Sequence, residues 1–250
     1  MQIHAVPQRQ GAVVERSRLL PDACLALAQL AGDIAYVKPY VVSVASTTSP
    51  VVDGIANRVE LIANRSAQLE ALEAPEGSVL TIGGDCAVEV APIGVARFRH
   101  GEGLGVHWFD AHPDLNTPST SPSGAFHGMA LRALFGEGDP SFAAKPALRH
   151  AVLVGARSID DGERAALALV GTTGECAYVH VDLDVLEPTE FDGACYPEPD
   201  GLSVAEVAAA IQAIPVPVVG AGITECATTD PHRLRLLTPI LEAVITRLTG

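Results

Sequence analysis

Two short segments of the chain place acidic residues and a histidine at a spacing that suits metal binding. Asp110, His112 and Asp114 occupy alternate positions directly after the apolar run Gly-Val-His-Trp-Phe. Asp182 and Asp184 show the same alternation within Tyr-Val-His-Val-Asp-Leu-Asp-Val. Successive side chains of a strand point to opposite faces, so residues two apart share a face. Carboxylates and an imidazole gathered in this way suit a hard or borderline divalent cation.

The paired aspartates at 182 and 184 also have a simpler interpretation. Two carboxylates on one face of a buried strand repel each other unless a cation or a proton lies between them. They would need neither if the strand had just emerged into solvent, where both would cap a turn before Pro188. The second cluster around His112 favours the metal-binding interpretation, because the two clusters together furnish one site.

The surrounding sequence predicts an α/β fold whose sheet is mainly parallel. Short apolar runs alternate with helical patterns along most of the chain, as in βαβ units. We expect strands at residues 41–44, 78–82, 104–109, 150–154, 177–183 and 216–223. We expect helices at residues 21–31, 57–72, 88–97, 128–135, 161–170, 204–214 and 234–248. A chain of 250 residues that is 48% hydrophobic can bury the core of a single domain, residues 1–250.

The unusual polar residues follow these strands. Residues 116–125 form the clearest loop, because proline, serine and glycine interrupt the segment throughout. Gly83 and Gly84 end another predicted strand, where they allow the backbone to turn tightly next to Asp85. Ligands of open α/β sheets bind outside the carboxyl ends of the strands. The sequence therefore predicts a site at this edge of the sheet.

Composition limits the classes of partner. Thirty acidic against 16 basic residues give a formal net charge of −14, which opposes binding to a phosphate backbone, so we expect no nucleic acid partner. The chain has no apolar window of the roughly 20 residues that span a membrane and no signal-like start, so we expect no membrane partner and a cytoplasmic location. Its five cysteines include no Cys-x-x-Cys pair, and neither a disulfide framework nor a zinc ribbon is indicated.

Six motifs resemble, in order, those of the arginase family, the ureohydrolases that include agmatinase and formimidoylglutamase. They are Gly-Gly-Asp-Cys (83–86), Asp-Ala-His-Pro-Asp-Leu-Asn (110–116), Ser-Gly-Ala-Phe-His-Gly (123–128), Gly-Ala-Arg-Ser-Ile-Asp-Asp-Gly-Glu (155–163), Asp-Leu-Asp (182–184) and Glu225. The resemblance implies a three-layer α/β/α fold. It also implies a hydrolase that cleaves a carbon–nitrogen bond of a linear guanidino or amidino compound, such as arginine or a related guanidino acid.

The resemblance further implies two manganese ions per chain, bridged by a hydroxide. Asp110 and Asp182 match carboxylates that bridge both ions. His112 and Asp184 match the remaining ligands of one ion, and Asp114 matches a ligand of the other. Metal ions lower the pKa of bound water, so that hydroxide exists near neutral pH and can attack the guanidinium or amidine carbon.

Position 86 departs from the resembled pattern, because the family usually places there a histidine that completes the second ion's ligands. Cys86 offers a thiolate, a soft donor that selects Zn²⁺ or Fe²⁺ over Mn²⁺. Three outcomes are open: a weaker manganese site, a different metal, or one ion only. If Cys86 binds no metal, it is a small apolar residue at a strand end.

Three further residues receive catalytic roles from the resemblance. Asp114 orients the hydroxide, Glu225 pairs with the cationic head of the substrate, and His127 shuttles protons towards the departing amine.

Substrate selection is implied by a separate set of residues. Asn116 and Ser123 match positions that hold an amino acid's α-carboxylate, and Asp160 matches one that accepts its α-ammonium. Ala125 stands where arginases carry asparagine, which removes one carboxylate contact and leaves arginine itself unassured. Glu163 matches an acidic position, but a solvated charge in the first turn of a helix would explain it equally.

Two other functions compete with hydrolysis of a guanidino or amidino substrate. One is deacetylation of an acylated amine on the related histone-deacetylase-like fold. The other is a catalytically degenerate arginase-fold protein with a binding or regulatory role, which Cys86 and Ala125 motivate. A homo-oligomer is a further possible assembly.

Overall fold

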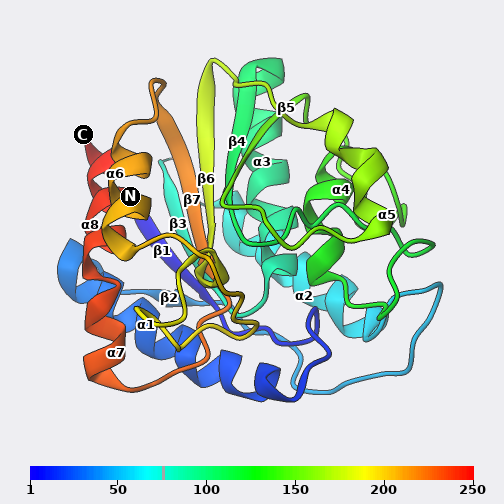
Figure 1. Cartoon of the computed structure of the whole chain (residues 1–250), viewed down its shortest axis with the longest axis horizontal. Helices are drawn as coiled ribbons and strands as arrows, with labels where there is room; N and C mark the ends of the chain where they lie inside the picture. Colours follow the sequence, from blue (N-terminus) through cyan, green and yellow to red (C-terminus); the bar gives the residue numbers. More distant parts are fainter. Residues whose placement is uncertain (75–76) are drawn as a thin grey trace.

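Seven strands form one continuous sheet in the computed structural model, which describes residues 1–74 and 77–250 (Figure 1). The strands are β1 (Gln2–Val6), β2 (Tyr40–Val41), β3 (Val79–Gly83), β4 (Leu104–Phe109), β5 (His150–Val154), β6 (Cys176–Asp182) and β7 (Val218–Thr224). Their order in space is β2-β1-β3-β7-β6-β4-β5, and each pairing is parallel. The carboxyl ends of all seven strands therefore lie at one edge.

Helices cover both faces of the sheet, which gives the predicted three-layer α/β/α arrangement (Figure 1). One face carries α1 (Leu20–Ala35), α6 (Val204–Gln212), α7 (Pro231–Leu236) and α8 (Thr238–Thr249). The other carries α2 (Arg58–Glu73), α3 (Val90–His100), α4 (Ala130–Leu134) and α5 (Asp161–Arg164). None of the helices in the described part of the chain combines the length and apolar character needed to cross a membrane.

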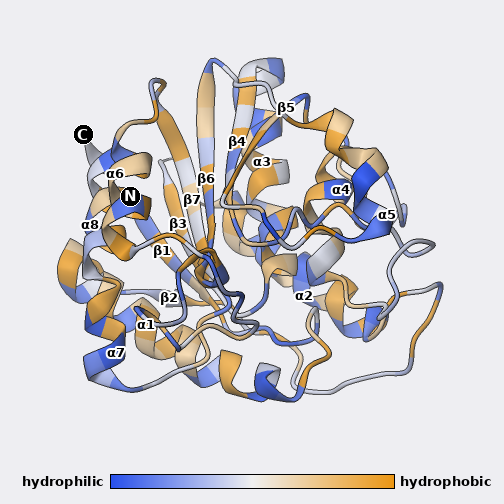
Figure 2. Ribbon diagram, viewed as in Figure 1, coloured by the Kyte–Doolittle hydropathy of each residue, from blue (hydrophilic) through white to orange (hydrophobic). Residues whose placement is uncertain are grey.

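The alternation of side chains along β6 explains how one strand serves both layers. Val179 and Val181 pack into the core beneath α1, α6 and α8, whereas Tyr178 packs into the opposite core with Trp108. Figure 2 shows the central strands dominated by apolar residues, as expected for a sheet covered on both faces. Against this background His180 and Asp182, which are also buried, stand out as polar residues on the face that Tyr178 shares.

The central strands agree with the sequence-based prediction to within two residues at each end, whereas other segments differ. β1 was not predicted, because Gln2 and His4 leave only a short and weak apolar alternation. The strand expected at 41–44 is limited to Tyr40–Val41 at the sheet edge. The helix expected at 161–170 is a single α-helical turn followed by a 3-10 helix, Ala165–Leu169.

The single helix expected at 234–248 was wrong, because two helices, α7 and α8, occupy this region. Pro239 lies in the first turn of α8. Proline has no N–H to donate to the carbonyl four residues earlier, and its ring clashes with that carbonyl, so one regular helix cannot continue from Arg235 through Pro239. The chain turns at Leu237, and α8 begins at Thr238.

Gly84 joins three strand ends at the carboxyl edge. Its N–H donates to the Val6 carbonyl (2.9 Å), and its own carbonyl accepts from the Glu225 N–H (2.6 Å). A Cβ at this position would overlap the carbonyl of Gln8. The loops after β1, β3 and β7 can approach each other this closely only because residue 84 has no side chain.

We predict that Gly84→Ala lowers the free energy of unfolding by about 1–3 kcal/mol, because the added methyl group forces the backbone apart. Chemical denaturation checks this. Gly94→Ala in α3 is the matched control, since no described heavy atom lies within 4 Å of a Cβ built there. It should raise stability by up to about 1 kcal/mol. Equal stability of both variants and the unaltered protein would contradict the close packing at Gly84.

Candidate metal centre

A cavity of about 300 Å³ opens at the carboxyl edge of the sheet. Nine of the eleven predicted site residues line it: His112, Asp114, Asn116, Ser123, His127, Asp160, Asp182, Asp184 and Glu225. The remaining two, Cys86 and Asp110, lie behind the wall. Cys86 Sγ is 3.0 Å from Asp182 Oδ2, and Asp110 Oδ1 accepts a hydrogen bond from the His112 N–H (2.6 Å). Segments far apart in the sequence therefore converge on one site.

Two strand ends build the floor of the site in the same way. β4 and β6 are neighbours, with Phe109 beside Val181, so Asp110 and Asp182 leave the sheet side by side. Asp110 accepts from the N–H two residues later, and Asp182 accepts from the Asp184 N–H (2.7 Å) in the same manner. These Asx turns fix one oxygen of each aspartate to the backbone and turn the chain sharply.

Three groups of possible ligand atoms lie within 4.8 Å of one another: Asp110, His112 and Asp184; Cys86, Asp182 and Glu225; and Cys86, Asp110 and His180. The first contains three of the four residues predicted to hold one ion, and His112 Nδ1 lies 2.8 Å from Asp184 Oδ2. Among the described residues, Asp114 belongs to no such group.

The backbone of Asp114 has a φ of 51°, in the left-handed region, as does that of Glu225 with a φ of 63°. Such backbone strain in non-glycine residues concentrates at functional sites.

The carboxylates of the site are buried far beyond what their charge favours. Burial first, and then neighbouring carboxylates, raise the pKa of Asp114 and Asp182 well above the ordinary range and that of Asp184 to about 7. Burial opposes ionisation of Asp110 too, but His112 and His180 outweigh it and lower its pKa. Asp182 and Asp184 are at most 4% exposed, so the interpretation that they lie in a solvated turn was wrong.

The donor set fits a divalent cation. Two buried oxygens, Asp114 Oδ2 and Glu225 Oε2, have no hydrogen-bond partner in residues 1–74 and 77–250. Within the described ranges, no lysine or arginine forms an ion pair with Asp110, Asp114, Asp182, Asp184 or Glu225. Histidines form ion pairs with three of these carboxylates, Asp110, Asp184 and Glu225. Carboxylates buried without sufficient positive charge need protons or a metal ion.

Cys86 lies among polar atoms and not in an apolar filler position. Its Sγ is 3.1 Å from Thr224 Oγ1 and 3.6 Å from His180 Nε2, in addition to its contact with Asp182. Burial, followed by the charge of Asp182, raises the pKa of the thiol well above its ordinary value. The thiol therefore holds its proton in the absence of a cation. A bound metal ion reverses this preference, because a coordinating thiol loses its proton.

The predicted catalytic pair is in contact. His127 Nδ1 is 3.0 Å from Glu225 Oε1, which also accepts from the Cys86 N–H (3.2 Å). Burial lowers the pKa of His127, but Glu225 outweighs burial and raises it. The contact with Glu225 therefore favours the protonated form of the imidazole, which faces the cavity.

The residues predicted to recognise the substrate lie at another part of the cavity wall. Asn116 Nδ2 donates to Asp160 Oδ2 (2.8 Å), and Ser123 Oγ accepts from the Ala125 N–H (3.2 Å). Glu163 is 4% exposed and forms a capping box with Asp160, which excludes the solvated charge considered above.

Sequence analysis did not identify the loop residues that cover His112. Glu198 Oε1 is 3.6 Å from His112 Nε2, and the Tyr196 ring meets the imidazole edge-on at 5.7 Å. Arg157 holds this loop to the end of β6, donating to the carbonyls of Asp184 (2.8 Å) and Glu198 (2.9 Å). Arg157 lay within a recognised motif, but no local pattern marked Tyr196 or Glu198.

Comparisons with known proteins agree on one family. The sequence model described as Arginase family matches residues 28–173 and 164–236. An N(omega)-hydroxy-L-arginine amidinohydrolase from Streptomyces lavendulae is 34% identical over 175 residues, 63% of this chain and 63% of that protein. An arginase from Bacillus caldovelox is 33% identical over 160 residues, 51% of this chain and 53% of that protein. The chain thus matches between about half and 63% of the length of these relatives.

Solved structures share the fold over the whole chain. The arginase from Bacillus cereus has a TM-score of 0.81 at 24% identity, covering 100% of this chain and 97% of that one. The Entamoeba histolytica arginase in complex with L-ornithine has a TM-score of 0.81 at 22% identity, covering 100% of both chains.

We predict that divalent cations stabilise the protein more at about pH 8 than at about pH 6. In the cation-free protein the pKa of Asp184 rises from 3.8 to about 7, so the folded state holds a proton that the unfolded chain has released. Stability is therefore lost as the pH rises through this window. Against burial, Asp110 and Asp184 raise the pKa of His112 from 6.5 to about 12, which extends the loss to higher pH.

Cation binding requires these donors without their protons, so it gains strength over the same window. Chelator-treated protein is heated with and without Mn²⁺ or Zn²⁺ at both pH values. At 100 times the dissociation constant, the stabilisation should reach about 2.7 kcal/mol. A shift in Tm that is equal at both pH values, or no shift, would argue against the donor set.

Proposed function

Since this chain belongs to the arginase family, we propose that it hydrolyses a carbon–nitrogen bond of a linear guanidino or amidino compound, using divalent cations. The observation that carries the proposal is the convergence of two equivalent Asx turns, after β4 and β6, on a cavity surrounded by buried carboxylates. Asp110, His112 and Asp184 would hold one cation. Cys86 and Asp182, with Asp114 nearby in the cavity, would contribute to the second. Manganese is the metal that the resemblance favours.

When bound, the cations supply hydroxide near neutral pH by lowering the pKa of water. The protein's own groups place the substrate for attack. Glu225 presents a buried carboxylate whose Oε2 has no hydrogen-bond partner, which suits a planar cationic head group. Asp114 also has an unpartnered oxygen at the cavity, and it orients the attacking group.

His127 completes the reaction by giving a proton to the departing amine. The bond between the central carbon and this nitrogen breaks as a carbon–oxygen bond forms, and the amine leaves neutral only after it gains a proton. Contact with Glu225 favours the protonated form of His127 and holds the imidazole close to the head group that Glu225 would bind.

An amino acid with a guanidino group is the substrate class we favour. Two relatives are named for arginine and for its N(omega)-hydroxy derivative, and both compounds carry an α-ammonium and an α-carboxylate. In this chain Asp160 would accept the ammonium, while Asn116 and Ser123 would contact the carboxylate. The net charge of −14 also favours a cationic substrate over an anionic one.

We expect the Mn²⁺-loaded protein to release an amine from at least one guanidino or amidino compound. The panel comprises arginine, N(omega)-hydroxyarginine, agmatine, guanidinobutyrate, guanidinopropionate and formimidoylglutamate, with urea or its counterpart and the amine both measured. His127→Asn should lower kcat about 10²–10⁴-fold. His232→Gln, on exposed α7, is the matched control and should leave kcat unchanged. Inactivity on all six compounds would refute the proposed function.

We expect Asp160→Asn to discriminate between substrates with and without an α-ammonium. Loss of a charged hydrogen bond should raise KM for arginine-like substrates about tenfold or more, whereas guanidinobutyrate should be unaffected. Asparagine retains the side-chain oxygen that accepts from the Glu163 N–H, so the helix cap survives. Equal effects on both substrate types would assign Asp160 a structural role only.

The two competing functions are less favoured. A catalytically degenerate protein would have no use for the contact between His127 and Glu225, or for the oxygens at the cavity that have no partner among the described residues. Deacetylation would be supported if an acetylated amine were turned over without release of urea.

A further inference from the structure

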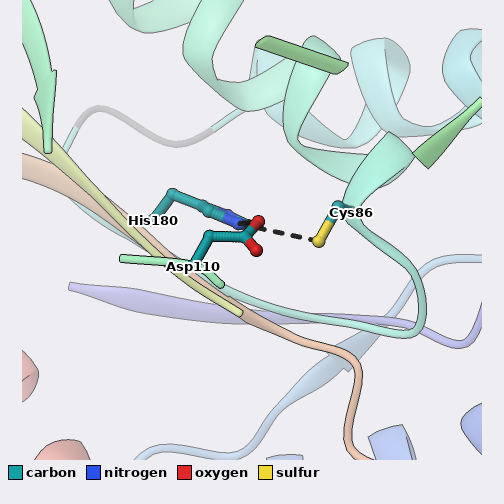
Figure 3. Close-up of side chains that lie close together, drawn as sticks. All are labelled: Cys86, Asp110 and His180. Carbon is teal, nitrogen blue, oxygen red and sulfur yellow. Dashed lines mark hydrogen bonds and ion pairs between the residues drawn. The ribbon is translucent and has the colours of Figure 1, made fainter. Parts of the chain in front are cut away.

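His180 is a buried histidine beside the site that the proposed mechanism does not use. It is 0% exposed, and it lies on β6 two residues before Asp182, on the same face of the strand. Its Nε2 is 3.6 Å from Cys86 Sγ and 3.9 Å from Asp110 Oδ2 (Figure 3). Its ring edge thus faces two atoms that the arrangement offers to a cation.

We propose that His180 supplies the imidazole ligand of the second cation site, together with Cys86 and Asp110, and that Glu89 holds its ring in place. The proposal rests on the proposed metal-dependent function. It moves the imidazole, which the family resemblance expects at position 86, to a neighbouring strand. The set of thiolate, imidazole and carboxylate suits a borderline cation such as Zn²⁺ better than Mn²⁺.

Glu89 provides the second observation that points to a bound cation. Its carboxylate is 0% exposed, and neither of its oxygens has a hydrogen-bond partner among the residues that the structure describes. Oε2 lies 3.7 Å from His180 Nδ1, the ring nitrogen that faces away from Cys86, and this nitrogen is also unpartnered. A metal-bound histidine almost always donates its other N–H to a carboxylate or carbonyl. Glu89, His180 and Cys86 lie in this order, with 3.7 Å between Glu89 Oε2 and His180 Nδ1.

A 3-10 helix, Cys86–Glu89, presents both partners of His180. Residues three apart in such a helix lie on the same side, so Cys86 and Glu89 flank the imidazole from one short segment. The neighbouring strand makes room for the arrangement. Gly222 pairs with His180 across β7 and β6, and a Cβ there would overlap the Glu89 carboxylate.

Trp108 fixes the plane of the imidazole. The two rings stack with their centroids 3.6 Å apart at 24°, and the indole Nε1 donates to Asp110 Oδ2 (3.0 Å). One side chain therefore orients two of the three proposed donors. The separation of 3.6 Å between Cys86 Sγ and His180 Nε2 also matches the edge of about 3.6 Å expected for sulfur and nitrogen on a tetrahedral Zn²⁺.

The test measures metal binding, not activity. His180→Phe keeps an aromatic ring stacked on Trp108 but removes both nitrogen donors. We expect it to bind one Zn²⁺ equivalent fewer than the unaltered protein, or to bind that equivalent at least tenfold more weakly, by elemental analysis after equilibrium dialysis. His107→Phe is the matched control: His107 is a buried strand histidine with an unpartnered Nε2 that belongs to none of the donor groups among the described residues. It should retain every equivalent.

Two further variants separate a ligand from a merely structural histidine. Glu89→Gln should weaken the same equivalent about 10–100-fold, as expected when the carboxylate partner of a ligand is lost. Cys86→His in the His180→Phe background should restore the lost equivalent, because it returns an imidazole to the site. A structural role of His180 would not be rescued in this way. Glu89→Gln, which leaves His180 in place, carries the test if His180→Phe does not fold.

Cobalt substitution gives an independent readout. The unaltered protein should show absorption from thiolate-to-Co²⁺ charge transfer, which Cys86→Ser abolishes and His180→Phe weakens or shifts. Unchanged metal equivalents, affinity and cobalt spectrum in His180→Phe would overturn the proposal. An inactive protein whose metal content still depends on His180 would refute the proposed function alone. An active one whose metal content is indifferent to His180 would refute this inference alone.

Discussion

The structure depends on one electrostatic constraint, the burial of several carboxylates around a single cavity. The protein supplies too little positive charge to balance them; they are Asp110, Asp114, Asp182, Asp184 and Glu225. Desolvation penalises each charge, and each carboxylate penalises its neighbours. In the absence of a cation, removal of these charges would stabilise the fold. A bound cation would offset the free energy lost through desolvation and through repulsion between the carboxylates. The tight turn at Gly84 and the left-handed backbone at Asp114 and Glu225 are unfavourable backbone features that hold the carboxylates close together.

A parallel sheet is suited to such a concentration of charge. Adjacent strands end at the same edge, so two turns with the same local geometry, one after β4 and one after β6, bring their carboxylates together. The order of the strands matters as well. β7 lies on the other side of β6 and places Glu225 opposite them, while β3 contributes the segment that begins at Cys86. Four neighbouring strands thus each provide part of the site.

The sequence predicted the parts of this arrangement that are encoded locally. Apolar runs located the central strands, and the Asp-Leu-Asp spacing marked Asp182 and Asp184 as a pair, because both patterns arise within a few residues. Strand alternation accounts for Asp182 but not for Asp184, because β6 ends at Asp182 and Asp184 lies in the 3-10 helix Leu183–Val185. β1 has a short and weak pattern and was missed. Tyr196 and Glu198 reach His112 only because Arg157 ties their loop to the end of β6, a contact between segments about 40 residues apart. The approach of His180 to Cys86, 94 residues apart, likewise required the assembled sheet.

The two halves of the site differ in chemical hardness, and this difference bears on how they act together. Asp110, His112 and Asp184 offer oxygen and imidazole donors near the cavity, whereas Cys86 and His180 add a thiol and an imidazole in the buried half. Asp110 has ligand atoms in both halves. A cation bound in one half would neutralise part of the negative charge that attracts a cation to the other half. It would also lower the pKa of the acidic groups that the two halves share, which frees these donors of protons. In the proposed two-cation site, occupation of one half would therefore alter the affinity of the other, and a soft donor at position 86 would let the halves select different metals.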